Sequence, residues 1–139
     1  MPTPHTATSG HTLTDLIRKE IRPILAREYA ESTLMHLYPA GDYWVAFEKS
    51  AYLLHRLSPD ALIFPLAIAG ITFPVIMASL DNGLFQTLTK ELSHRDMNDG
   101  RCTFRTNLEN NTGAYLSWHT REAAPIADAL PAHPWPDRF

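Results

Sequence analysis

Three residues near the middle of the chain carry groups that could perform acid–base chemistry. Glu48, Tyr52 and His55 are four and three positions apart, so a helix that begins at Glu48 would place all three on one face. A carboxylate, a phenol and an imidazole in that arrangement could move protons to and from a substrate. The same spacing also describes an ordinary polar helix face, and the sequence does not separate the two interpretations.

A second group of residues, toward the carboxyl-terminal end, could bind anions. Apolar and polar residues alternate in RCTFRTNL (101–108) and in AYLSWHT (114–120), which predicts two strands of a hairpin closed by ENNTG. The alternation places Cys102 and Phe104 inside and displays cationic and aromatic groups outside: Arg101, Arg105, Tyr115, His119 and, just beyond, Arg121. Such groups suit phosphates, carboxylates or stacked bases. The alternative is a plain solvated face of an antiparallel sheet.

The other reactive side chains form no recognisable catalytic or metal-binding motif. Cys102 is the only cysteine, and a position inside the sheet beside Phe104 would suppress its reactive thiolate. The seven histidines show no HxH, HxxxH or HExxH spacing, so the sequence predicts no metal site. It contains no cofactor-binding motif either, and we expect no cofactor.

Length, charge and cysteine content restrict the class of protein. A chain of 139 residues fits one domain that is large enough to bury a core. A single cysteine excludes an intramolecular disulfide, and the first 12 residues lack the basic and apolar segments of a secretory signal, so we expect a soluble cytoplasmic protein. The 12 basic and 15 acidic residues give a net charge of −3 without blocks of like charge, which argues against a global attraction to nucleic acid or membrane.

The uncharged stretch ALIFPLAIAGITFPVIMASL (61–80) is long enough either to span a bilayer or to build a core. Pro65 and Pro74 would break a spanning helix twice, and no Lys or Arg lies between positions 56 and 90 to anchor its ends. We therefore predict no membrane span but two strands, 62–68 and 71–81, with a turn between them. Both strands are apolar on both faces, as central strands of a sheet are.

Periodicity and turn residues predict the remaining elements. An apolar stripe at helical spacing carries Pro23, where we expect a kink or a break into two helices. The turn PAGD separates two runs of β-forming residues that are apolar on both faces, and HRDMNDG (94–100) is predicted to be a loop. The predicted elements are a helix over 13–29, strands over 33–38 and 43–48, and helices over 50–57 and 83–94.

Together these elements predict an α+β domain over residues 12–130. It would contain a mainly antiparallel sheet of five or six strands packed by two or three helices, with the helices over 13–29 and 83–94 on one side. The composition of residues 1–11 predicts a disordered tail, and residues 131–139 predict a Pro-rich extended tail.

Three hypotheses for function follow. The favoured one is a small non-enzymatic protein-interaction or regulatory module that binds a protein partner or forms a homodimer, because the apolar inventory exceeds what the predicted core needs. The alternative is a binder of anions, nucleotides or nucleic acid through the outer hairpin face described above. The third is an acid–base enzyme around Glu48 and His55.

Overall fold

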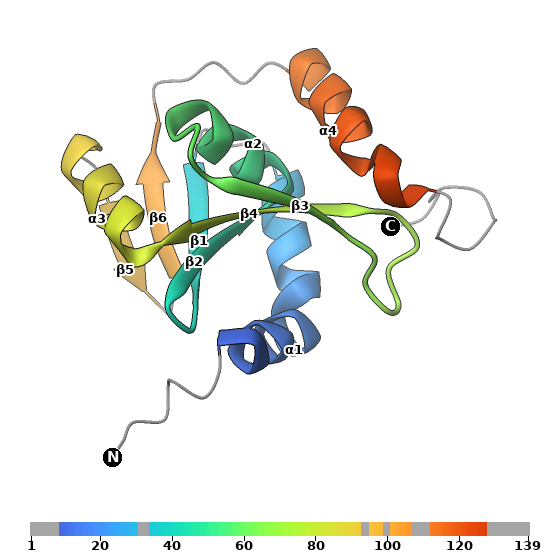
Figure 1. Cartoon of the computed structure of the whole chain (residues 1–139), viewed down its shortest axis with the longest axis horizontal. Coiled ribbons are helices and arrows are strands. Elements are labelled where there is room, and N and C mark those ends of the chain that lie inside the picture. Colours follow the sequence, from blue (N-terminus) through green and yellow to red (C-terminus); the bar gives the residue numbers. More distant parts are fainter. Residues whose placement is uncertain (1–8, 31–33, 93–94, 99–100, 107–111, 128–139) are drawn as a thin grey trace.

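The computed structural model describes residues 9–30, 34–92, 95–98, 101–106 and 112–127, which form an α+β fold (Figure 1). All paired strands run antiparallel, and the six-stranded sheet has the order β3-β4-β2-β1-β6-β5. The predicted fold class is confirmed, with four helices in the described residues instead of two or three. The elements are α1 (Ser9–Tyr29), β1 (Leu34–Ala40), β2 (Tyr43–Phe47), α2 (Glu48–Leu57), β3 (Leu62–Leu66), β4 (Val75–Asp81), α3 (Asn82–Glu91), β5 (Arg95–Asn98), β6 (Arg101–Arg105) and α4 (Thr112–Ala127).

Both faces of the sheet are covered by helices (Figure 1). On one face α1 buries a core that includes Ile24, Leu25, Val45, Phe47 and Val75. On the other face α2, α3 and α4 bury a core that includes Met35, Leu37, Ile76, Phe85, Phe104 and Trp118. The expectation that the first helix and the helix over 83–94 share one side is therefore wrong. Strands that are apolar on both faces must be covered on both faces. α1 covers one face, and α3 helps to cover the other.

The β1–β2 hairpin formed as the sequence predicted. Its two-residue turn contains Gly41, whose φ of +69° is a conformation that glycine adopts without steric cost. Met35, Leu37 and Trp44 face the α2 side, while Tyr38, Val45 and Phe47 face α1, as the alternation indicated.

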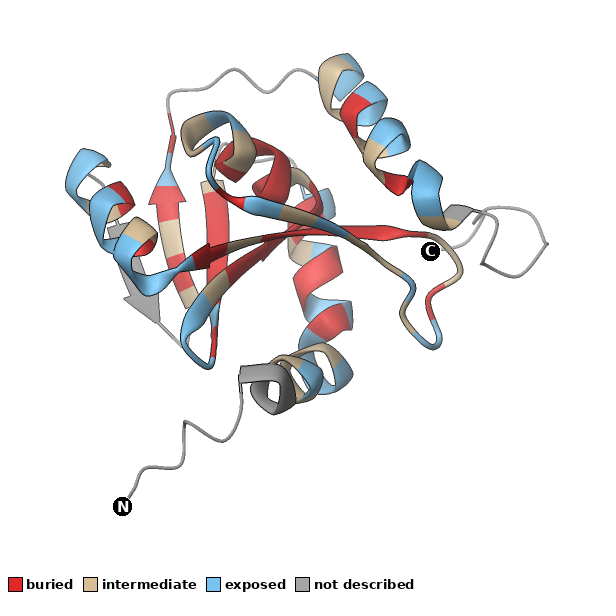
Figure 2. Ribbon diagram, viewed as in Figure 1, coloured by how far each residue is buried: buried red, intermediate tan, exposed pale blue. Residues whose placement is uncertain are grey.

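The uncharged stretch forms the antiparallel strands β3 and β4 with a turn at Ala69 and Gly70 between them, so the predicted pair of strands is confirmed. Both strands are shorter than predicted, because residues 67–68 and 71–74 lie outside them, and the expected central position is wrong for β3. Pro74 immediately precedes β4, and Pro65 lies in β3, which is an edge strand. Both are positions at which a missing amide donor is tolerated. Figure 2 shows β4 largely buried and β3 partly exposed. In the described part of the chain, no helix is long and apolar enough to cross a membrane.

Two predictions near the carboxyl-terminal end are wrong. Residues 95–98 form the strand β5 instead of a loop, and β5 pairs with β6. Residues 114–120, predicted as the second hairpin strand, belong to α4. Seven residues fit either period, but the protected positions continue at helical spacing through the next turns, at Trp118 and His119, then Glu122 and Ala123.

The other helices lie close to their predicted positions. α1 passes through Pro23 as one helix, so of the two expected outcomes the break into two helices is wrong and the kink stays a prediction. Its first residue, Ser9, falls inside the expected amino-terminal tail; residues 1–8 and 131–139 lie outside the described residues. α3 begins after Asp81, whose carboxylate accepts a hydrogen bond from the amide of Leu84 at 2.8 Å and so caps the helix.

Candidate functional site

Glu48, the first residue of α2, is buried in a strained conformation. Its φ is +53°, in the left-handed region that residues other than glycine seldom adopt, and its side chain is 3% exposed. Oε1 accepts a hydrogen bond from the backbone amide of Ile76 at 2.9 Å and lies 2.9 Å from Nε2 of His119. Oε2 accepts a hydrogen bond from the hydroxyl of Tyr29 at 3.2 Å. These contacts connect α2 to β4, α4 and α1. Because several elements hold the side chain of Glu48, its strained backbone conformation can persist.

A second buried carboxyl group, that of Glu28 in α1, caps the same helix. Its Oε1 accepts a hydrogen bond from the amide of Ser50 at 2.8 Å, and its Oε2 lies 2.6 Å from the hydroxyl of Ser50. Ser50 is in the first turn of α2, where amides lack partners within the helix, and the N-cap residue Phe47 supplies no side-chain cap. Burial raises the pKa of Glu28 to about 8, although the hydrogen bonds from Ser50 oppose the shift. The carboxyl group is therefore mostly protonated at neutral pH.

Two tyrosines beside these carboxyl groups hold their protons firmly. Burial raises the pKa of Tyr29 and of Tyr115 above the usual range, and the nearby carboxylate of Glu48 adds to both shifts. The side chains of Glu28 and Glu48 are both almost fully buried and line none of the three cavities described below. A general acid or base must come within hydrogen-bonding distance of its substrate, and none of these three cavities reaches either carboxyl group.

The predicted acid–base trio shares one helix, but the partners of Glu48 differ from those of Tyr52 and His55. Glu48 bonds to His119 instead of His55. The ring of Tyr52 packs 5.3 Å from that of Trp118, and the ring of His55 stacks 6.0 Å from the same indole. Neither Nδ1 of His55 nor Nε1 of Trp118, both buried, has a hydrogen-bond partner among the described residues. The catalytic role of the trio stays a prediction.

The predicted cationic face is divided between two elements. Arg101 and Arg105 lie on β6, on the face opposite Cys102 and Phe104, as the alternation indicated. In contrast, the other three members, Tyr115, His119 and Arg121, lie on α4, which packs against β3, β4 and α2. The five residues therefore do not form one sheet surface, and that geometric expectation is wrong. Anion binding by the two arginines stays a prediction.

Beside Arg101, the imidazole of His36 is held neutral. Its Nδ1 lies 3.1 Å from the hydroxyl of Thr103, which also accepts a hydrogen bond from Nε of Arg101 at 3.3 Å. Burial, together with the positive charges of Arg101, Arg27 and Lys49, lowers the pKa of His36 to about 4. This histidine therefore carries no charge near neutral pH.

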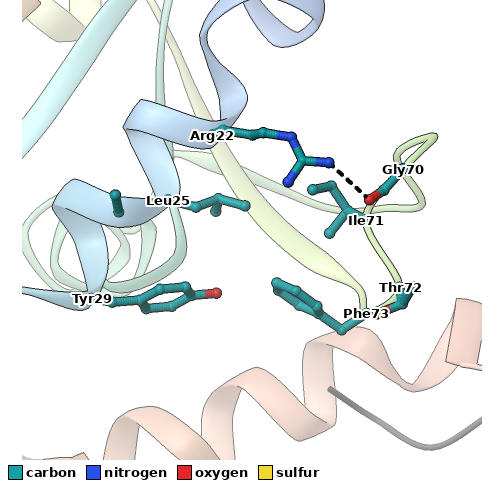
Figure 3. A pocket seen from close by; sticks show the side chains of 8 residues that line it. Arg22, Leu25, Tyr29, Gly70, Ile71, Thr72 and Phe73 are labelled. Carbon is teal, nitrogen blue, oxygen red and sulfur yellow. Dashed lines mark hydrogen bonds between the residues drawn. The ribbon is translucent and has the colours of Figure 1, made fainter. Parts of the chain in front are cut away.

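Three cavities follow α1 along its border with β3 and the β3–β4 loop. The first, the Tyr29 cavity, has a volume of about 450 Å³. Figure 3 shows the side chains of Tyr29 and Phe73 pointing toward each other within it. Above them Arg22 donates a hydrogen bond to the carbonyl of Gly70 at 3.3 Å. Gly70 has a φ of +86°, a turn conformation that favours glycine. The hydrogen bond from Arg22 holds this turn against α1.

The second cavity, the basic cavity, has a volume of about 630 Å³. It shares Arg22 and Ile71 with the Tyr29 cavity and is lined by three cationic side chains, Arg18, Lys19 and Arg22. No acidic residue of the described chain lines it. Asp15 forms an exposed ion pair with Arg18 at 3.3 Å, so the positive charge of the cavity rests mainly on the other two.

The third cavity, the β3 cavity, has a volume of about 440 Å³ and is almost entirely apolar. It shares Leu66 with the basic cavity. Tyr43, Leu62 and Phe64, which we term the β3 surface, line it and are 43%, 60% and 40% exposed. The other lining residues are Leu13, Ala40, Val45, Leu66, Met77 and Ser79.

Sequence reasoning missed both the buried carboxyl cluster and the β3 surface. One signal for Glu28 was present, because this acid continues the helical spacing of Ile21, Ile24 and Leu25 and so falls on the buried stripe of α1. The exposure of Leu62 and Phe64 had no such signal, because a strand that is apolar on both faces predicts a central position.

The described residues contain no group of three or more His, Cys, Asp and Glu side chains that could hold a metal ion. The chain matches no protein-family model, no curated protein and no solved structure. The function of the chain is therefore inferred from the geometry of the three cavities and of the buried cluster.

Proposed function

We propose that this chain is a protein-interaction module that binds a short apolar segment of another protein on the β3 surface. One observation carries the proposal. Five large hydrophobic residues of the described chain are exposed, and three of them, Tyr43, Leu62 and Phe64, lie together around one apolar cavity. Contiguous exposed apolar groups around a concavity are typical of interaction sites, whereas single exposed apolar residues are common and carry no meaning.

The size of the β3 surface favours a short segment over a second copy of the chain. A fully exposed aromatic side chain presents roughly 200 Å², so three large side chains that are about half exposed offer on the order of 300 Å². A standard stable interface buries about 800 Å² on each partner. The β3 surface alone is therefore too small for a stable homodimer, while its cavity suits one or two anchoring side chains.

The segment is expected to dock on the face of β3 through its side chains. Pro65 pairs with Ile76 of β4, and no strand of the described residues lies on the other side of β3. A proline within a strand is tolerated where its nitrogen faces away from the neighbouring strand, so at Pro65 the outer edge offers no N–H group. An added strand would lack a donor there, which disfavours extension of the sheet. The single cysteine supports a cytoplasmic site of action for this binding.

The proposal is tested with a library of random decapeptides displayed on phage and selected on the wild-type chain. Synthetic copies of the selected peptides are expected to bind with micromolar dissociation constants, measured by fluorescence anisotropy. The double variant Leu62→Ser, Phe64→Ser should weaken binding at least tenfold, because two apolar contacts are lost. Leu116→Ser removes an equally exposed apolar residue from α4 and should leave the binding unchanged.

Three outcomes contradict the proposal. The selection could yield no binder, or binders that tolerate the double variant although its melting temperature matches that of the wild type. Sedimentation equilibrium could also show a dimer that the double variant abolishes. The last result would make a second copy the occupant of the β3 surface, in place of a foreign segment.

A further inference from the structure

The basic cavity adjoins the β3 surface, and this neighbourhood restricts the kind of segment that the module would bind. The two cavities meet at Leu66 and both border α1. We infer that the partner is an extended segment in which an apolar anchor, seated on the β3 surface, is accompanied by an acidic residue that contacts Lys19 and Arg22. This inference rests on the proposed function and adds the charge and spacing of the ligand.

The cationic groups are placed to receive a carboxylate. Lys19 and Arg22 are three positions apart in α1, so they are neighbours on the helix surface. Arg22 donates one hydrogen bond of 3.3 Å to the carbonyl of Gly70, which leaves most of its five N–H donors available. Lys19 forms no ion pair with an acidic residue of the described chain. A carboxylate between the two would accept charge-assisted hydrogen bonds without displacing an internal ion pair.

The charge at this site is opposite to that of the chain as a whole. The net charge is −3, yet three of the residues that line the basic cavity are cationic and none is acidic. Local positive potential on a protein of negative net charge favours an acidic ligand at that place while the remainder of the surface repels it. Among apolar segments that fit the β3 surface, the positive charge of the basic cavity therefore favours those that also carry an acidic residue.

The length of α1 between the two cavities sets the spacing. Leu13 lines the β3 cavity, whereas Lys19 and Arg22 lie six and nine residues later in the same helix. At 1.5 Å per residue this separation is about 9 to 14 Å along the helix axis. An extended chain advances about 3.3 Å per residue, so the acid is expected about three or four positions from the anchor.

The experiment uses the decapeptides selected on the wild-type chain and measures their affinities by anisotropy. Most are expected to carry Asp or Glu three or four positions from a Phe, Leu, Ile or Trp. Replacing that acid with its amide should weaken binding about threefold to tenfold at low salt, because partly exposed ion pairs contribute modestly. In the variant Lys19→Glu, Arg22→Glu, peptides with Lys at that position should bind more tightly than peptides with Asp.

Two controls keep the outcomes separate. Lys90→Glu reverses an exposed charge on α3 and should leave the preference for Asp intact. Lys19→Glu alone preserves the hydrogen bond between Arg22 and Gly70, so it reports on charge even where the double variant is unstable. Peptides that require Leu62 and Phe64 but ignore the charge at Lys19 and Arg22 would overturn this inference and leave the proposed function standing. The absence of any peptide that requires Leu62 and Phe64 would overturn both.

Discussion

The replacement Glu28→Gln tests whether α1 caps α2 through a protonated carboxyl group. A buried carboxyl group whose pKa rises from 4.5 to about 8 binds a proton in the folded chain that the unfolded chain releases. The contribution of Glu28 to stability is therefore complete below pH 4.5 and is lost as the pH rises through 8. At about 1.4 kcal/mol for each unit of pKa, the loss is on the order of 4 to 5 kcal/mol in total. Glutamine keeps an oxygen for the amide of Ser50 and cannot ionise, so it should remove this dependence.

His36 acts in the opposite direction and shapes the profile of the wild-type chain. Its pKa falls from 6.5 to about 4 on folding, so the unfolded chain binds a proton that the folded chain excludes. Its contribution to stability is complete above pH 6.5 and is lost as the pH falls toward 4. Between pH 4.5 and 6.5 the effects of Glu28 and His36 on the free energy of unfolding offset each other. Between pH 6.5 and 8 the shift of Glu28 acts without the opposing shift of His36, and the free energy of unfolding should fall by roughly 2 kcal/mol.

Urea denaturation followed by tryptophan fluorescence and circular dichroism, at intervals from pH 4.5 to 8.5, measures these free energies. The stability of Glu28→Gln relative to the wild type should increase steadily with pH up to about 8. Glu20→Gln, which neutralises an exposed acid of the same helix, should differ from the wild type by an amount that does not follow this profile. His36→Gln should make the decline of stability with pH begin near pH 4.5. A pH-independent difference between Glu28→Gln and the wild type would refute the argument.

Three further predictions concern the buried residues. Glu48→Ala should lower the free energy of unfolding by about 3 kcal/mol in urea denaturation, because it leaves the buried amide of Ile76 without its acceptor; Glu48→Gln, which keeps an oxygen there, should cost less. Trp118→Ala should cost about 3 to 5 kcal/mol in the same assay, because its indole, 3% exposed, fills the contact between α4 and α2. Cys102 is fully buried, so a thiol reagent such as an aromatic disulfide should modify the native chain far more slowly than the chain in urea.

The parts of the fold that were predictable are those with local and mutually consistent signals. The β1–β2 hairpin combines a turn that needs Gly41 with two flanking runs of β-forming residues. In α4 the local signal was ambiguous, because seven residues from Ala114 onward fit both strand and helix periods. The sequence also could not show that β6 has its partners in β1 and β5, since pairing between distant segments is decided by tertiary packing.

The candidate site depends on non-local packing in the same way. The sequence singled out Glu48, but its partners Tyr29 and His119 come from α1 and α4 and lie 19 and 71 residues away in the chain. A helical face within α2 could predict only contacts four residues apart. The buried cluster therefore had no pattern of its own in the sequence apart from the position of Glu28 in an apolar stripe.

The disagreement between the sequence of β3 and its position supports the interaction hypothesis. A strand with apolar residues on both faces is suited to the centre of a sheet, yet β3 lies at an edge. One face contributes Ile63 to the core beneath α4, while Leu62 and Phe64 stay exposed on the other. Edge strands are protected from pairing by prolines or charges, and β3 has a proline but no charge. A strand that blocks extension of the sheet and still keeps an apolar face is expected where that face receives side chains from a partner.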